Sequence, residues 1–275
     1  MIYVTKFDGR REPFKKSKIL RTCLRVGVDR KNAREIVDRI SRNVYDGITT
    51  KEIYHMILKE LETFHRPKSS IYKLRESLSL IEPHAFELFT AKLLGAFGYQ
   101  TEHNIIIEGL CVDHEVDVVA KKGDELILVE CKHHKNFHRF SGLDVALQVY
   151  ARMEDIDDGF KKSKNKYNFT NAWIFTNSKV SDHAIRYTTA KGMKLTGWHY
   201  PETNGIEVMV QKSDVYPVTV LKVKRSVLSK MMENGIITIQ DITDKKLRKL
   251  KFSDYTIENI IRQKNEILNH TFQFS

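Results

Sequence analysis

The sequence predicts an α/β core, a mixed central sheet flanked by helices, between two mostly helical regions. Three observations predict it: the order of elements expected over residues 83–212, the helical spacing of apolar residues before that segment, and the distribution of charge. With 275 residues, 41% of them hydrophobic, the chain is long enough for more than one domain. We expect three regions, residues 1–82, 83–212 and 213–275.

Charge divides the chain in the same way. The net charge of +11 is made up of +8 over residues 1–82, −1 over 83–212 and +4 over 213–275. A basic protein favours a polyanionic partner. No apolar run approaches the ~20 residues of a membrane-spanning helix, so we expect no membrane partner. The three cysteines are widely spaced and the N-terminus is charged, which predicts a reducing, cytoplasmic location.

The first region is predicted to be a short hairpin followed by helices. Asp8 and Gly9 form a turn signal between two strand-like segments. Apolar residues then recur at helical spacing, and Asp29 is a suitable N-cap. The expected helices cover roughly residues 18–26, 30–44, 52–64 and 69–80.

The middle region alternates helices and strands, in an order typical of an α/β fold. We expect a helix over 84–97, strands over 116–120 and 125–132, a helix over 142–153, a strand over 172–176, a helix over 182–190 and a strand over 193–198. The last region is expected to be mostly helical over 220–234 and 243–269, with a joint that resembles a helix-hairpin-helix corner.

The hairpin in the middle region carries the strongest chemical signal. Residues 121–124 are its expected turn, and if Lys121 pairs with Asp124, then Asp117 lies opposite Leu128. Strand alternation places the apolar residues of both strands on one face. The other face carries Glu115, Asp117, Glu130 and Lys132, at the end away from the turn.

These carboxylates predict a cation site. Carboxylates on one face repel one another unless a cation neutralises them, and oxygen ligands suit Mg²⁺ or Mn²⁺. Lys132 could orient or deprotonate an attacking water, or balance charge near a phosphate. The alternative is an exposed hairpin whose charged residues only face solvent.

The same hairpin offers a rival, zinc-type set of ligands. Cys111, His114, Cys131 and His133 have nearly finger-like spacing. Alternation points Cys131 away from Glu130 and into the apolar face, so we favour a core cysteine.

The order of Asp, about a dozen residues, and Glu-x-Lys resembles the PD-(D/E)xK nuclease superfamily. Over residues 84–200, the segments FELFTAKLLGAFGYQTE, HEVDVV, LILVECK and AWIFTNSKVSDHAIRYTTAKGMKLTGW resemble the Mrr-type restriction endonuclease domain. The resemblance implies a Mg²⁺-dependent DNA endonuclease in which Asp117 and Glu130 bind the metal and Lys132 serves the attacking water. It also implies that an acidic residue of the first helix, here Glu87, can complete the metal site.

Three further interpretations stay open at this site. Glu87 also fits an ordinary surface glutamate on an amphipathic helix. Gln148, on the helix after the hairpin, is a candidate catalytic residue that could reach the metal-bound water or DNA. Asp144 on the same helix fits a solvated face better.

The first region resembles the ATP-cone, a small nucleotide-binding regulatory domain. The segments VTKFDGRREPFKKSKI and VYDGITTKEIYHMILKEL carry the resemblance over about residues 1–82. It implies ATP or dATP as a regulatory ligand. By residue-wise match, the nucleotide contacts fall on Val4, Lys6, Glu12, Lys18 and Thr50. The alternative is a basic helical DNA-binding domain.

Together, these patterns favour a DNA endonuclease regulated by ATP or dATP. The expected partners are DNA, a nucleotide effector and further copies of the chain in a homo-oligomer. The alternative is a nucleotide-sensing DNA-binding regulator with an inactive nuclease fold, against which the intact Asp117, Glu130 and Lys132 argue.

Overall fold

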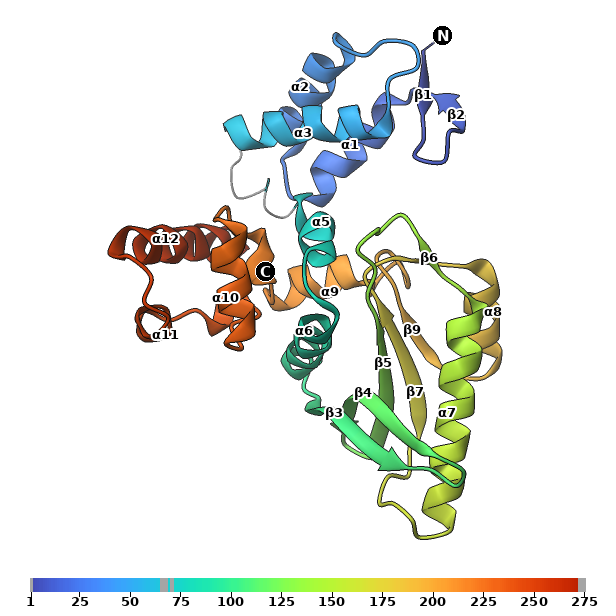
Figure 1. Ribbon diagram of the computed structural model, residues 1–275. Helices are drawn as coiled ribbons and strands as arrows, with labels where there is room; N and C mark the ends of the chain where they lie inside the picture. The colour runs from blue at the N-terminus through green and yellow to red at the C-terminus, as the bar shows by residue number, and fades with distance from the viewer. Residues whose placement is uncertain (1, 65–68, 70–71, 272–275) are drawn as a thin grey trace. The chain divides into compact units, whose positions relative to one another are not determined.

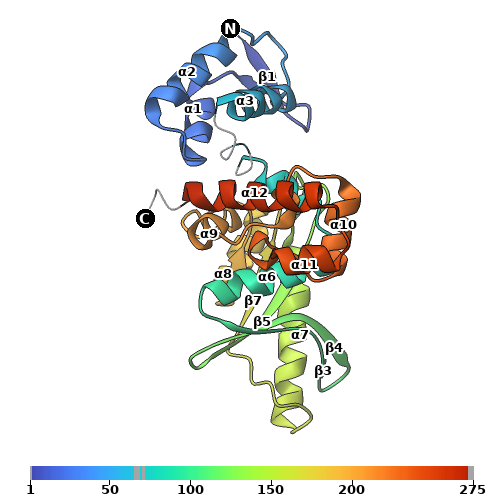
Figure 2. The ribbon, with the colours of Figure 1, turned by 90° about the vertical axis from the view of Figure 1, so that its left-hand side faces the viewer.

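The computed structural model describes residues 2–64, 69 and 72–271 of the chain, shown in Figures 1 and 2. It divides into two compact units, Met1–Leu74 and Arg75–Ser275. None of the helices in the described part of the chain combines the length and the apolar character of a membrane span.

The first unit is a small hairpin with three helices. Its elements are β1 (Tyr3–Thr5), β2 (Arg11–Pro13), α1 (Lys16–Arg25), α2 (Arg30–Ser41) and α3 (Thr50–Phe64). Asp29 caps α2 as expected, because its side chain accepts hydrogen bonds from the backbone N–H groups of Lys31 and Asn32. The expected hairpin and these helices are confirmed. Part of the helix expected over 69–80 falls at residues 70–71, outside the described residues, and α5 covers Leu74–Ser79.

The second unit is built on a five-stranded mixed sheet in the order β3-β4-β5-β7-β9. Its strands are β3 (Gln100–Glu108), β4 (Asp113–Lys122), β5 (Glu125–Lys132), β7 (Asn171–Thr176) and β9 (Lys194–Thr196). The first three strands pair antiparallel and the last three pair parallel. The predicted α/β core with a mixed central sheet is therefore confirmed.

Helices cover both faces of this sheet (Figure 1). Helix α6 (Pro83–Ala96) lies on one face and helices α7 (Leu143–Lys161) and α8 (Asp182–Ala190) lie on the other, while α9 (Ile206–Ser213) packs against α6. Helices α7 and α8 pack against each other, and Val145, Ala146 and Val149 of α7 join the core formed by the strands. Helix α6 lies against β3, β4 and β5. A second, two-stranded parallel sheet joins β6 (Phe140–Ser141) to β8 (Lys179–Val180).

The C-terminal region is helical and packs within the second unit. It consists of η1 (Val218–Val220), α10 (Arg225–Glu233), η2 (Ile239–Asp241), α11 (Asp244–Lys249) and α12 (Asp254–Thr271). Two polar contacts join it to earlier helices: Lys92 Nζ of α6 lies 2.7 Å from Asp241 Oδ1, and Thr219 Oγ1 donates to the Ser77 carbonyl at 2.8 Å.

The hairpin register differs from the expected one. Lys121 pairs with Leu126, and Lys122 pairs with Glu125, so the expected pairing of Lys121 with Asp124 is wrong. The loop has two residues, because Gly123 adopts a positive φ of 57° that glycine accepts at little cost. The shift is two residues, so every side chain stays on the face that alternation predicted.

Two further expectations are corrected by tertiary packing. The sequence predicts no strand over residues 100–108, where β3 lies, because polar and apolar residues there do not alternate cleanly. Helix α7 extends well beyond residue 153, because Ile156 is buried and Gly159 packs closely against the backbone at Gly109.

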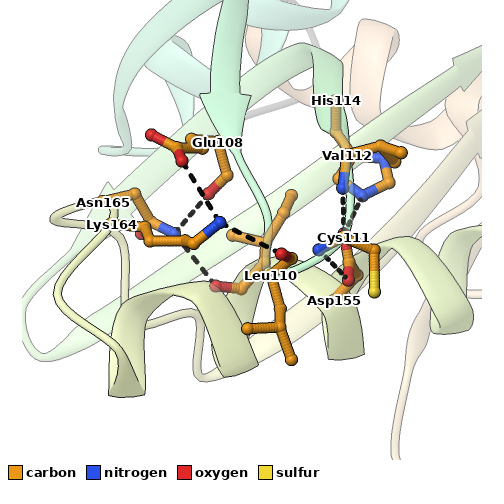
Figure 3. Close-up of polar contacts among 9 residues, drawn as sticks. Glu108, Leu110, Cys111, Val112, His114, Asp155, Lys164 and Asn165 are labelled. Carbon is orange, nitrogen blue, oxygen red and sulfur yellow. Dashed lines mark hydrogen bonds and ion pairs between the residues drawn. The ribbon is translucent and has the colours of Figure 1, made fainter.

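The turn between β3 and β4 is held against α7 by one carboxylate (Figure 3). Asp155 accepts a hydrogen bond from the backbone N–H of Cys111 at 2.9 Å, and its Oδ2 lies 2.7 Å from His114 Nε2. Hydrogen bonds from Cys111 and His114 hold the pKa of Asp155 below its usual range. Residues after α7 add to this contact: Lys164 donates to the Leu110 carbonyl at 3.1 Å and Asn165 to that of Glu108 at 2.7 Å. The start of β4 is therefore fixed to α7.

Replacing Asp155 with alanine should loosen this turn. The change leaves the backbone N–H of Cys111 and the ring of His114 without their partner, which should lower the free energy of unfolding by about 1–2 kcal/mol. Urea denaturation of the two proteins measures the difference. Asp158→Ala is the control, because within the described part of the chain the side chain of Asp158 makes only an ion pair with Lys161, at an exposed position of the same helix. Equal losses in the two variants would contradict the importance of this contact.

Candidate active site

Two neighbouring strands place the predicted site residues together. Val118 of β4 pairs with Val129 of β5, so Asp117 and Glu130 are the next residues on the two strands and share a face. Lys132 lies two residues further along β5 on the same face. The sequence prediction that these three side chains converge on one face is consistent with the observed register.

The sheet is buried around this site. Val119 and Leu128, on the same face as Asp117, are buried against α7, and Val118 and Val129 are buried on the opposite face. Asp117 and Glu130 are accordingly only partly exposed, whereas Glu115 and Lys132 on the same face are exposed. The carboxylates lie where the covered part of the sheet ends.

Burial and neighbouring charge act strongly on Asp117. Desolvation, followed by the repulsion of Glu130, raises the pKa of Asp117 to about 7. The backbone N–H of Cys131 donates to Asp117 Oδ2 at 2.6 Å and opposes this shift. The negative charge of Glu87 contributes in the same direction as Glu130. Near neutral pH, this carboxyl group is thus poised between its two protonation states.

Glu130 has an ion-pair partner that the sequence did not reveal. Arg152 of α7 donates from Nη1 to Glu130 Oε2, and the side chains of the two residues are only 26% and 18% exposed. In the sequence, Arg152 follows the candidate residue Gln148 by one helical turn, which places both on the same face of the helix. No sequence motif marks this arginine. Arg152 neutralises the carboxylate that the sequence assigned to a metal.

The other predicted site residues lie around this centre. The side chain of Glu87 of α6 is 19% exposed, and its Oε2 lies 3.1 Å from His84 Nδ1. Its effect on the pKa of Asp117 shows that it belongs to the same electrostatic environment. Lys132, Gln148 and Asp144 are exposed, and Lys132 forms no ion pair with the described residues.

The donor chemistry suits a hard cation, although the described residues do not bring three or more His, Cys, Asp or Glu side chains into one group able to hold a metal ion. Asp117 and Glu130 supply carboxylate oxygens from adjacent strands, which are the ligands that Mg²⁺ and Mn²⁺ prefer. The hydrogen bond from Cys131 and the ion pair to Arg152 currently occupy oxygens of these two groups.

The structure separates the residues of the zinc-type set. Cys111 and His114, at the β3–β4 turn, contact Asp155 of α7. His133 Nε2 donates instead to the Leu78 carbonyl at 2.9 Å. Burial raises the pKa of the Cys131 thiol well above its usual range. Cys131 itself is only partly exposed, and the four residues do not meet at one point.

A network of hydroxyl groups fixes the chain beyond Lys132. Ser141 Oγ donates to Thr176 Oγ1 at 3.0 Å and lies 3.1 Å from Ser178 Oγ. Asn177 holds His134 through two hydrogen bonds, accepting from its backbone N–H and donating to its carbonyl, at 2.8 and 2.9 Å. Since Thr176 pairs with Lys132 in the sheet, this network supports the strand end that carries the lysine.

In the first unit, three of the predicted nucleotide contacts, Lys6, Glu12 and Lys18, form a polar cluster. Glu12 of β2 lies 2.8 Å from Lys6 Nζ and also contacts Lys18 Nζ of α1. Hydrogen bonds from Lys18 and then Lys6 lower the pKa of Glu12 to about 2. Val4 is buried in β1, and Thr50 begins α3.

The structure also ties β1 to the start of α3. The backbone N–H of Thr5 donates to the Ile48 carbonyl at 2.9 Å, and Thr5 forms an isolated bridge with Thr49. The hairpin that carries Val4 and Lys6 is thereby joined to the helix that begins at Thr50.

Asp117 should make the stability of the metal-free protein depend on pH. Its raised pKa means that the folded protein binds this proton more tightly than the unfolded chain does. The free energy of unfolding should therefore fall as pH rises from about 4 to about 7. Urea denaturation in EDTA should show a smaller fall for Asp117→Asn than for the unchanged protein. Asp113→Asn, at an exposed carboxyl of the same strand, is the control, and identical pH profiles for all three proteins would contradict this account.

Comparisons with known proteins agree with this arrangement. Three family models match the chain in order: "ATP cone domain" over residues 2–76, "Restriction endonuclease" over 78–199 and "AF1548-like, C-terminal" over 216–268. An uncharacterized protein of Archaeoglobus fulgidus is 36% identical over 181 residues, which is 65% of this chain and 99% of that protein. A second uncharacterized protein of this organism is 45% identical over 47 residues, 17% of this chain and all of that protein.

A solved structure is also similar to this chain. The crystal structure titled as a protein of unknown function, AF1548, is similar with a TM-score of 0.59 and 35% identity, covering 68% of this chain and all of that one. The mixed central sheet and the order of matched domains thus agree, and the chain belongs to the Mrr-type restriction endonuclease family, with an ATP-cone domain before the endonuclease domain and an AF1548-like domain after it.

Proposed function

We propose that the chain is a Mg²⁺- or Mn²⁺-dependent DNA endonuclease whose activity is regulated by ATP or dATP bound to the ATP-cone. The observation that supports it most is the position of Asp117 and Glu130 on adjacent strands, with Lys132 next along the same face. We place this activity in the cytoplasm, and the three free cysteines are consistent with a reducing compartment.

The proposed reaction is hydrolysis of a phosphodiester bond. A divalent cation held by Asp117 and Glu130, with Glu87 beside them, would supply Lewis-acid chemistry to the phosphate. Lys132 is exposed and without an ion-pair partner among the described residues, so its ammonium group is available to orient the attacking water and to stabilise charge on the phosphate. Gln148 is exposed on α7, where its amide could contact the water or the DNA.

The basic C-terminal region supports DNA as the substrate. Lys245, Lys246 and Lys249 of α11 are exposed, as is Lys251 directly after it. Exposed lysines of this kind bind phosphates of a nucleic-acid backbone without reading its sequence. We expect this region to contribute to DNA affinity and not to the chemical step.

A second function is favoured by one observation, the ion pair between Arg152 and Glu130. If Arg152 occupies Glu130 permanently, the metal site cannot form. The chain would then be a nucleotide-sensing DNA-binding regulator with an inactive nuclease fold. Cleavage assays separate the two functions.

Changes at the site should stop cleavage while DNA binding is retained. Asp117→Asn, Glu130→Gln and Lys132→Ala should each lower the cleavage rate at least about a hundredfold, because each removes a group that acts on the phosphate or the water. The assay uses plasmid and branched DNA with Mg²⁺ or Mn²⁺, and gel-shift measurements follow binding.

Lys135→Ala is the matched control, since Lys135 is an exposed lysine just after β5 whose ion pair with Glu82 spans 3.5 Å. Its cleavage rate should equal that of the unchanged protein. Full cleavage by all three site variants would refute the assignment. Absence of cleavage by the unchanged protein under every metal and nucleotide condition would favour the regulator.

Lysines of the first unit should support nucleotide binding. Lys6→Ala and Lys18→Ala should each weaken binding of ATP or dATP about tenfold or more, because both ammonium groups lie at one carboxylate and are close enough to share a triphosphate. Residues 1–82 contain no GxxxxGK[ST] loop, so the nucleotide should bind without being hydrolysed.

Calorimetry measures this affinity, and Lys59→Ala, at an exposed position of α3, is the control. A nucleotide that regulates the protein should also change its cleavage rate or its oligomeric state. If neither ATP nor dATP binds at millimolar concentration, the regulatory part of the proposal is wrong, and the basic first region would revert to a DNA-contacting role.

A further inference from the structure

We propose that Arg152 is an exchangeable partner of Glu130: it holds this carboxylate while no divalent cation is bound, and moves to a phosphate oxygen of the DNA when a cation binds. The inference rests on the proposed function, because it takes Asp117 and Glu130 as the metal ligands. It assigns Arg152 two successive partners at the same site.

The contact between Arg152 and Glu130 is sheltered from solvent. Both side chains are mostly buried, so the attraction between guanidinium and carboxylate is weakened less by water than that of a surface ion pair. Glu130 projects from β5 and Arg152 from α7, so this pair also joins the helix to the sheet.

The backbone of α7 is fixed near this arginine. Asp155, three residues after Arg152, is hydrogen-bonded to the β3–β4 turn (Figure 3). Ile156, the next residue of the helix, is buried in the core. Any exchange of partner must therefore come from the side chain of Arg152 and not from movement of the helix. Arginine has a long side chain with several rotatable bonds, which makes such a change local.

Charge explains why the exchange would follow cation binding. Glu130 lies beside Asp117 on the neighbouring strand, so two carboxyl groups share this part of the sheet. Arg152 contributes one positive charge, whereas a divalent cation contributes two and coordinates carboxylate oxygens directly. A cation at Glu130 competes with the guanidinium for the carboxylate and repels it.

A guanidinium released at this position has a suitable second partner. Its planar fork of N–H donors matches the oxygens of a phosphate group. The scissile phosphate must approach the same cation, so it lies within the surroundings from which Arg152 departs. The arginine would then bind substrate only when the metal site is filled.

The test measures the Mn²⁺ affinity of the full chain by calorimetry at about pH 8. Arg152→Met removes the competing charge at similar length and should bind Mn²⁺ at least about tenfold more tightly, the effect of one charge-assisted hydrogen bond. Arg152→Lys keeps the charge without the fork and should give an intermediate gain. Arg186→Met, at an exposed arginine of α8, should leave the affinity unchanged.

A second measurement follows DNA affinity with Ca²⁺ and in EDTA. The unchanged protein should bind DNA more tightly with Ca²⁺, and Arg152→Met should lose most of this gain, at least about fivefold. If the only role of Arg152 were structural, Arg152→Met should lower thermal stability without tightening Mn²⁺ binding. Weaker or unchanged Mn²⁺ affinity in Arg152→Met overturns the exchange, and if that variant does not fold, unchanged affinity in Arg152→Lys overturns it.

The same Mn²⁺ measurements test the proposed metal site independently of Arg152. Wild-type binding of Mn²⁺ that is lost in Asp117→Asn and Glu130→Gln supports the metal site, whatever Arg152 does. Absence of Mn²⁺ binding by the unchanged protein would remove the metal site and, with it, the exchange.

Discussion

Placing two carboxylates side by side on a covered sheet is the constraint on which the rest of the second unit depends. Burial removes much of the water around Asp117, and Glu130 repels it, so the pKa of Asp117 rises for both reasons, of which burial is the larger. The fold opposes this cost with a backbone N–H from Cys131 and a guanidinium from Arg152. Such groups are costly for stability, and their retention is characteristic of a functional site.

Helix α7 meets this constraint in two places. One turn carries Arg152 to Glu130, and the next carries Asp155 to the turn that begins β4. The strand with Asp117 is thus fixed at its start by the same helix that neutralises its neighbour. Gly159 allows the helix to continue close to the backbone at Gly109, where a larger side chain would collide with it. The length of α7 is therefore part of the architecture of the site.

The first unit uses related electrostatics at its surface. Glu12 holds two lysines near the hairpin, and its low pKa keeps it ionised at neutral pH. An anionic ligand would meet lysines whose positions are already restricted. The relative in Archaeoglobus fulgidus matches 65% of this chain over nearly its whole length, so that protein does without a substantial part of the present sequence. This difference is consistent with a modular construction, in which an ATP-cone domain is joined to a nuclease-type core.

The sequence by itself determined the fold class, the nuclease-type hairpin and the face shared by Asp117, Glu130 and Lys132, because strand alternation is local and survives a two-residue change of register. The family of both domains followed from motifs that are contiguous in the chain. Tertiary structure alone decided the partner of Glu130 and the fixing of the β3–β4 turn. Arg152 and Asp155 lie on a helix separated from the strands by a loop, and nothing local to them specifies which strand residues they meet. Contacts of that kind depend on how the helix packs across the sheet, which is set by the burial of the whole core.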